Sequence, residues 1–197
     1  LLRALPNLTN PATRPAPPKY LASLISDLER TRWEDLPAGA TKVRFAVNGL
    51  DGDGWVLPHG EKLAVLSPFV TAPVLERLAK GYGSKENRQL ISRAEELDGI
   101  DPEIRERFSI STLDERATEY EEGAADEPNP SDLEGLHAKV YLVEKGSRLQ
   151  IHTGSANATT AATVPTKGGR TRNVEVMATL DGPKTRMGTI YQALFSE

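Results

Sequence analysis

The chain of 197 residues is 38% hydrophobic and 26% charged, which is enough apolar material to bury one sizeable core. It has no cysteine, which excludes disulfides and thiolate metal sites and fits a cytoplasmic protein. No apolar run approaches the ~20 residues needed to cross a bilayer, and no signal segment opens the chain, so we expect no membrane contact. Since the chain has only three histidines, a His-rich metal site is not expected, and we expect no cofactor.

The net charge of −4 conceals an uneven distribution along the sequence. Residues 95–134 hold 15 Asp and Glu against 3 Lys and Arg, whereas residues 1–94 and 135–197 each carry an excess of 4 basic groups. These basic flanks could attract a phosphate-rich ligand, but ordinary solvated charges explain the same counts equally well.

The first 40 residues are predicted to be a linker followed by an N-terminal helix. Residues 6–18 contain five prolines, which prevent a regular helix or an internal strand. Apolar residues then recur at helical spacing over 19–33, where core packing explains the stripe. The chain does not begin with Met, and this with the Pro-rich stretch leads us to expect that a further segment precedes it.

Residues 41–197 are predicted to form one α/β domain. Alternation at 42–47 and a continuous apolar run at 63–66 predict strands, the second buried on both faces. Thr71 is placed to cap a helix whose apolar face packs on the sheet. Further strands are predicted near 89–92 and 108–111, separated by a helical stretch near 101–107, and this alternation is typical of layered α/β domains. The acidic stretch 118–134 is predicted to be an exposed loop.

The segment 137–143 alternates as a strand, so His137 and Lys139 are expected to point to the same side of the sheet. The apolar run at 149–153 is expected to pair with it as a hairpin, with His152 exposed. Gly154-Ser155-Ala156-Asn157 then ends the second strand, and a helix predicted over 158–162 would place its N-terminus, which favours an anion, beside Ser155 and Asn157.

A third strand predicted at 173–178 brings Glu175 into the same region. A carboxylate beside a histidine fixes its tautomer and raises its basicity, so Glu175 is expected to orient His137. Taken singly, these residues are explained by strand pairing, turns and caps. Their joint order and spacing instead favour a functional interpretation.

In this order the residues resemble the phospholipase D superfamily, whose motif is His-x-Lys, four residues and Asp, then Gly-Ser-x-Asn, with Glu or Gln on a following strand. Glu144 stands where the motif has Asp, and the gap from it to Gly154 is three residues longer than usual. The segments at 66–69 and 154–159 also resemble bacterial restriction and phage-defence nucleases of this superfamily. The likeness covers about residues 62–197 and implies a mixed β-sheet flanked by helices on both faces, forming one half of a two-fold unit.

The resemblance implies a metal-independent phosphodiesterase that acts through a phosphohistidine intermediate. It implies catalytic roles for His137, Lys139, Asn157 and Glu175, and phosphate binding by Lys139, Ser155 and Asn157. Nucleic acid, DNA in preference to RNA, is the expected substrate, and the expected setting is restriction or antiviral defence. Lipid hydrolysis is less favoured because the sequence has no evident membrane-binding stretch.

The superfamily's reaction uses two such motifs, whereas this sequence contains one. The second could come from another copy in a homodimer or from a missing N-terminal half, which the start of the chain slightly favours. An alternative of a different class is a non-catalytic nucleic-acid-binding or scaffold module of a larger defence complex.

Overall fold

The computed structural model describes residues 4, 8, 10, 12, 16–32, 36, 37, 39–51, 54–112 and 137–195, apart from the side chains of Ala193 and Phe195. The acidic loop predicted at 118–134 lies outside these residues. The chain divides into two compact units, Leu1–Leu36 and Pro37–Glu197. None of the described helices combines the length and the apolarity needed to cross a bilayer.

The first unit contains helix α1 (Leu21–Arg30), which is shorter at both ends than the predicted 19–33. None of its residues is buried, so the apolar stripe does not pack into a core as the spacing suggested. Arg30 pairs with Asp27 at 2.6 Å across one turn, and both side chains are exposed.

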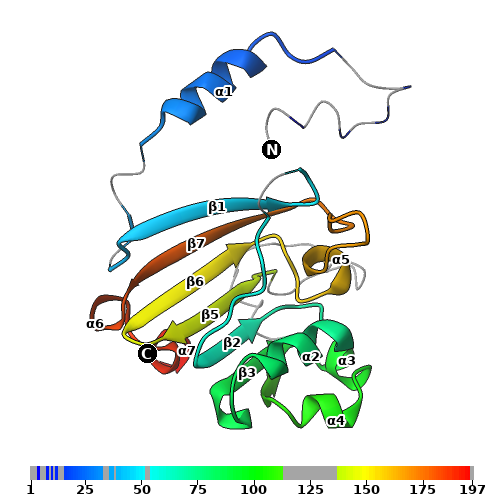
Figure 1. The fold of residues 1–197 in the computed structure, drawn as a ribbon, viewed down its shortest axis with the longest axis vertical. Helices are drawn as coiled ribbons and strands as arrows, with labels where there is room; N and C mark the ends of the chain where they lie inside the picture. Colours follow the sequence, from blue (N-terminus) through cyan, green and yellow to red (C-terminus); the bar gives the residue numbers. More distant parts are fainter. Residues whose placement is uncertain are drawn as a thin grey trace, which may run out of the picture. The chain divides into compact units, whose positions relative to one another are not determined.

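The second unit is a mixed α/β domain built on one seven-stranded sheet (Figure 1). In spatial order the strands are β1 (Lys42–Asn48), β7 (Glu175–Pro183), β6 (Arg148–Gly154), β5 (Val140–Lys145), β2 (Lys62–Leu66), β3 (Arg88–Ser92) and β4 (Ser109–Thr112). The last three are parallel to one another, whereas β1, β7, β6, β5 and β2 pair antiparallel in turn. The strands predicted near 42–47, 63–66, 89–92 and 108–111 are confirmed.

Helices cover both faces of this sheet. They are α2 (Ala72–Lys80), the 3-10 turn η2 (Lys85–Asn87), α3 (Ala94–Asp98), α4 (Pro102–Arg105), α5 (Thr160–Thr163), α6 (Lys184–Met187) and α7 (Ile190–Phe195). Leu63 and Val65 of β2 belong to the larger core cluster with α2, whereas Ala64 between them packs with Ile190 of α7. Because alternate residues of a strand point to opposite faces, the two clusters lie on opposite sides of the sheet.

The predicted hairpin is present, with Tyr141 paired to His152 in the centre of β5 and β6. However, β5 begins at Val140 rather than at His137, so the His-x-Lys segment lies just before the strand. Four consecutive residues of β5 are buried, as expected for a central strand covered on both faces.

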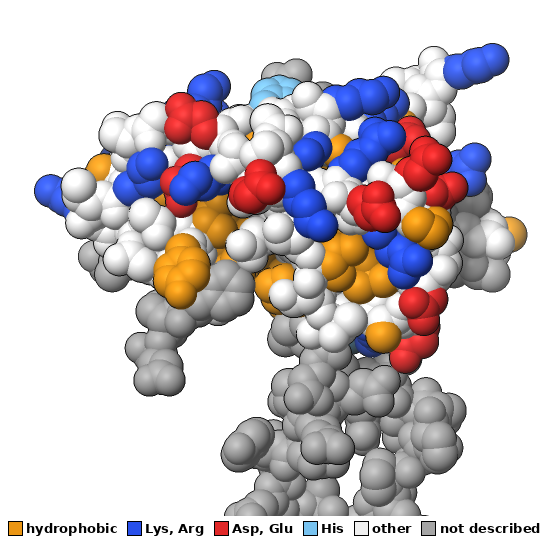
Figure 2. Space-filling view, turned by 90° about the horizontal axis from the view of Figure 1, so that it is seen from below, with side chains coloured by type: hydrophobic (Ala, Val, Ile, Leu, Met, Phe, Trp, Pro, Cys, Tyr) orange, Lys and Arg blue, Asp and Glu red, His pale blue; other side chains and the backbone are white. Residues whose placement is uncertain are grey.

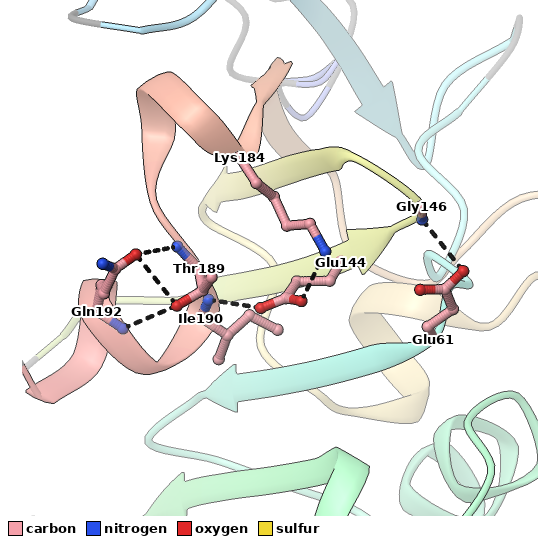
Figure 3. A network of polar contacts seen from close by, with 7 residues as sticks. All are labelled: Glu61, Glu144, Gly146, Lys184, Thr189, Ile190 and Gln192. Atoms are coloured by element: carbon pink, nitrogen blue, oxygen red, sulfur yellow. Dashed lines mark hydrogen bonds and ion pairs between the residues drawn. The ribbon is translucent and has the colours of Figure 1, made fainter.

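Glu144, near the far end of β5, fixes the C-terminal helices to the sheet (Figure 3). Its carboxylate accepts hydrogen bonds from the backbone N–H of Ile190 at 2.9 Å and from Lys184 Nζ at 3.2 Å. Burial acts to raise the pKa of Glu144, but the Ile190 and Lys184 hydrogen bonds and the nearby lysine charges outweigh it and hold the pKa below its ordinary value. A buried carboxylate at this position therefore joins α6 and α7 to the sheet.

Replacing Glu144 with Ala should lower the free energy of unfolding by about 2–4 kcal/mol, because the Ile190 N–H and the Lys184 ammonium both lose their buried acceptor. Glu144→Gln keeps an acceptor for Ile190 and should cost less. Urea unfolding of the two variants measures the difference. Equal stabilities for the wild type and Glu144→Ala would contradict this role.

The expectation that His152 is exposed is wrong, because its side chain is only 6% exposed. Its Nδ1 accepts a hydrogen bond from Trp55 Nε1 at 3.0 Å and lies 2.9 Å from Thr179 Oγ1. Since Nδ1 accepts from an indole N–H, the proton of the neutral ring resides on Nε2. The pKa of His152 is lowered to about 4, mainly by burial and also by the charge of Arg44, while the charge of Asp181 opposes the shift.

The buried neutral His152 makes stability depend on pH. The unfolded chain protonates this ring near pH 6.5 and the folded chain near pH 4, so the folded state loses stability as the pH falls through this range, by about 3 kcal/mol in total. Urea unfolding at several pH values should show a shallower loss for His152→Gln than for the wild type. Identical pH profiles for the two proteins would rule out this contribution.

Candidate functional site

Five strand ends meet at one end of the sheet, which we call the site end. The C-terminal ends of β2, β3 and β6 lie beside the N-terminal ends of β5 and β7, because Leu66 pairs with both Ile91 and Val140, and Gly154 pairs with Met177. In Figure 1 this is the end toward which the arrowheads of β2 and β6 point. The residues that follow or precede these ends include Ser67, Arg93, His137, Lys139, Ser155, Asn157 and Glu175.

Lys139 is the buried cation of the site end and is only 8% exposed. Its Nζ donates to the backbone carbonyl of His137 at 2.6 Å and lies 3.1 Å from His137 Nδ1. The His137 side chain itself is exposed. The two side chains of the His-x-Lys segment therefore contact each other, but they precede the strand on which they were predicted to lie.

Three influences act on the Lys139 ammonium. Burial lowers the pKa of Lys139 most, the positive charge of Arg93 lowers it further, and the negative charge of Glu175 raises it. The net effect is a pKa below the ordinary value. Two cations and one carboxylate thus share the site end, and this arrangement favours the binding of an added anion.

Gly154 allows the β6 and β7 backbones to approach each other closely. Its φ of 158° is rarely adopted by residues with a side chain, and a Cβ there would meet the Val176 carbonyl oxygen at 2.0 Å. The approach lets Ser155 make two hydrogen bonds to Val176 of β7. The Ser155 N–H donates to the Val176 carbonyl, and the Ser155 Oγ accepts from the Val176 N–H, each at 2.9 Å.

Glu175 is held by neutral donors. Its Oε2 accepts from Ser155 Oγ at 2.5 Å, and its Oε1 accepts from Asn173 Nδ2 at 3.0 Å. Among the described residues these two, rather than His137, are its hydrogen-bond partners, so the expected orientation of His137 by Glu175 is not seen. The carboxylate instead supports Ser155 and acts on Lys139 through its charge.

Asn157 is fixed between two fully buried alanines, Ala156 and Ala158. The Ala156 carbonyl accepts from Tyr141 Oη at 3.2 Å, and the Ala158 N–H donates to Ser67 Oγ at 2.9 Å. Ser67 Oγ donates to the Phe69 carbonyl at 2.7 Å and is 3.4 Å from Asn157 Oδ1, so its contact with Asn157 is the weaker one. The backbone is therefore held firmly while the Asn157 side chain is held loosely.

The anion-binding helix predicted at 158–162 needs correction. Helix α5 starts at Thr160 and ends at Thr163, so it is a single turn that begins three residues after Asn157. β-Branched threonines lower its propensity, and Pro165 restricts Val164 and prevents extension. So short a helix supplies little dipole, and the positive field at the site end comes mainly from side chains.

Arg93 was not predicted from the sequence. It is the first residue after β3 and the N-cap of α3, and its guanidinium lies over the Phe69 ring at 5.0 Å from the centroid. The one available signal was its place directly after a predicted strand ending at Ser92, where the ends of parallel strands gather polar side chains.

The charged side chains of one further face of the molecule are mixed in sign. On the face shown in Figure 2, Lys and Arg side chains are interspersed with Asp and Glu rather than gathered into one basic patch. Within the described ranges, no three His, Cys, Asp or Glu side chains are grouped closely enough to hold a metal ion. The donors at the site end suit an anion.

The chain matches no protein-family model, and no curated protein shows significant similarity to it. The roles of the residues at the site end must therefore be inferred from their own geometry and from the motif that they form.

Removing the charge of Glu175 should lower the pKa of Lys139 further, because burial and Arg93 would then act unopposed. An NMR titration of the Lys139 Cε resonance gives this pKa in the wild type and in Glu175→Gln. Lys139→Met identifies the resonance. Glu61→Gln removes an exposed carboxylate near the opposite end of the sheet and serves as the control. An unchanged or higher Lys139 pKa in Glu175→Gln would contradict the proposed coupling.

Proposed function

We propose that this chain is one half of a metal-independent phosphodiesterase of the phospholipase D type that cleaves nucleic acid. The observation that carries the proposal is the gathering of His137, Lys139, Ser155, Asn157 and Glu175 at one end of a mixed sheet that has helices on both faces. The order of the motif along the chain and the pairing of β5, β6 and β7 both favour this interpretation.

In the proposed reaction His137 attacks phosphorus through its exposed imidazole. A phosphorus–nitrogen bond forms while the bond to the leaving oxygen breaks, and that oxygen takes a proton from a second histidine. Water activated by the second histidine then breaks the phosphorus–nitrogen bond and restores His137. In this mechanism Lys139 and Asn157 bind the non-bridging oxygens, on which charge builds up.

The second histidine must come from outside the motif described here. A twofold pair of chains, or a second motif elsewhere in a longer polypeptide, would meet this need. Light scattering on the samples used for the activity assay distinguishes these two sources. If the site forms in a homodimer, the rate of cleavage must rise with the fraction of dimer.

One observation favours a binding module as the second candidate. When the Lys139 ammonium donates to His137 Nδ1, the neutral imidazole carries its proton on Nε2 and neither nitrogen is free to attack. A substrate phosphate that draws Lys139 to itself would release this contact in the enzyme. In a binding module the contact would persist and the site would hold phosphate without cleaving it.

Labelled DNA and RNA, each single- and double-stranded, test the proposal directly. We expect cleavage that persists in EDTA and falls by at least about 10³-fold in His137→Ala, since a nucleophile is lost. His59→Ala is the matched control, because His59 is an exposed loop residue preceding β2.

Cleavage that disappears in EDTA, or that survives in His137→Ala, would show that this mechanism is wrong. Salt-sensitive binding without cleavage by a sample that contains two motifs would favour the binding module.

A further inference from the structure

Arg93 belongs to the site end but to no part of the motif. It directly follows Ser92, whose Oγ donates to the Ser67 carbonyl at 2.7 Å and ties the end of β3 to the end of β2. Both serines are fully buried. The backbone from which Arg93 extends is therefore held in place beside the segment that contacts Asn157 and Ala158.

The Arg93 guanidinium packs one face against an aromatic ring, but its Nη2 donor has no acceptor among the described residues. The Phe69 ring lies at 5.0 Å, which leaves the in-plane N–H donors to other groups. Nη2 is buried and has no hydrogen-bond partner in the described part of the chain. Because an unpaired buried donor is costly, a charged group in this state is commonly completed by a ligand.

Arg93 is also close to Lys139 in electrostatic terms, since its charge lowers the pKa of the Lys139 ammonium. Glu175 offsets this repulsion at Lys139, because its charge acts on the Lys139 pKa more strongly than that of Arg93 does, and burial is what keeps the pKa low. A phosphate between the two cations would supply an acceptor for the buried Arg93 Nη2 and a negative charge for the buried ammonium.

We propose that Arg93 is a further substrate-binding residue of this site, and that its guanidinium donates hydrogen bonds to the same phosphate group that Lys139 binds. The planar fork of arginine matches two phosphate oxygens, which the single ammonium of lysine cannot do. The proposal rests on the proposed function only for the identity of the substrate, because phosphate binding can be measured without turnover.

The alternative is that Arg93 serves only packing, by stacking on Phe69 and starting α3. Two substitutions separate these roles. Arg93→Lys keeps the charge but loses the fork, whereas Arg93→Gln loses the charge and keeps a shorter polar side chain. Arg186→Gln is the matched control, because Arg186 is exposed and lies on α6, beyond the other end of β7.

The experiment measures the binding of inorganic phosphate by ³¹P NMR and of a short single-stranded DNA by fluorescence anisotropy over a range of salt concentrations. Arg93→Gln should weaken phosphate binding at least about tenfold, the effect of losing one charge-assisted hydrogen bond. It should also reduce the slope of log K against log salt for the DNA by about 0.7, the value for one phosphate contact on a single strand. Arg93→Lys should weaken phosphate binding less, and Arg186→Gln should change neither quantity.

Unchanged phosphate affinity in a folded Arg93→Gln would overturn the proposal, as would loss of DNA affinity without loss of phosphate affinity, since Arg93 would then contact a different phosphate. Failure of the wild type to bind phosphate or DNA would overturn it as well. Circular dichroism and urea unfolding establish that each variant is folded. Phe69→Leu removes the ring that the Arg93 guanidinium packs against, and normal phosphate binding by this variant would show that binding depends on Arg93 itself and not on its stacking. If Arg93→Gln behaves as expected but the wild type cleaves nothing, the binding role stands and the proposed nuclease does not.

Discussion

The candidate site depends on the close approach of β6 and β7 at Gly154. Only a residue without a side chain fits against the Val176 carbonyl, and the contact turns Ser155 so that its hydroxyl reaches both the Val176 N–H and Glu175. Through this approach the carboxylate is held near Lys139. If the two strands lay further apart, Ser155 could not bond with Glu175, and the carboxylate would not be held near Lys139.

Much of the sheet could be predicted because its signals are local. The continuous apolar runs of β2 and β5 are typical of strands that are buried on two faces, and the run of β6 across a short turn is typical of a hairpin. The contact between His137 and Lys139 was expected from strand alternation, but it forms in the segment before β5, where Lys139 Nζ reaches the His137 carbonyl and ring. The order of strands along the chain predicted that Glu175 lies on a neighbouring strand. It did not indicate that Ser155 and Asn173 are the hydrogen-bond partners of Glu175.

The remaining features depend on contacts between distant segments. His152 is buried because Trp55, almost a hundred residues earlier in the chain, covers it, and a single polar residue in an alternating strand carries no sign of this. Helix α5 is an exception with a local cause, because its own threonines lower its helix propensity and Pro165, directly after the C-cap Val164, prevents extension. Arg93 stands outside the motif, and its approach to Phe69 and Lys139 arises only when β2, β3 and β5 pair.

The charge balance of the site end is consistent with a place for a phosphate rather than a finished catalytic centre. Burial lowers the pKa of Lys139, so its positive charge is costly to hold in the free protein. A phosphodiester monoanion bound beside Lys139 would offset this cost with its negative charge. Proton transfer to a leaving group needs an acid on the opposite side of phosphorus, and His137 is the only histidine placed at this end of the described sheet. In the proposed reaction the site end therefore supplies the phosphate-binding groups and the nucleophile, and the acid comes from a second motif.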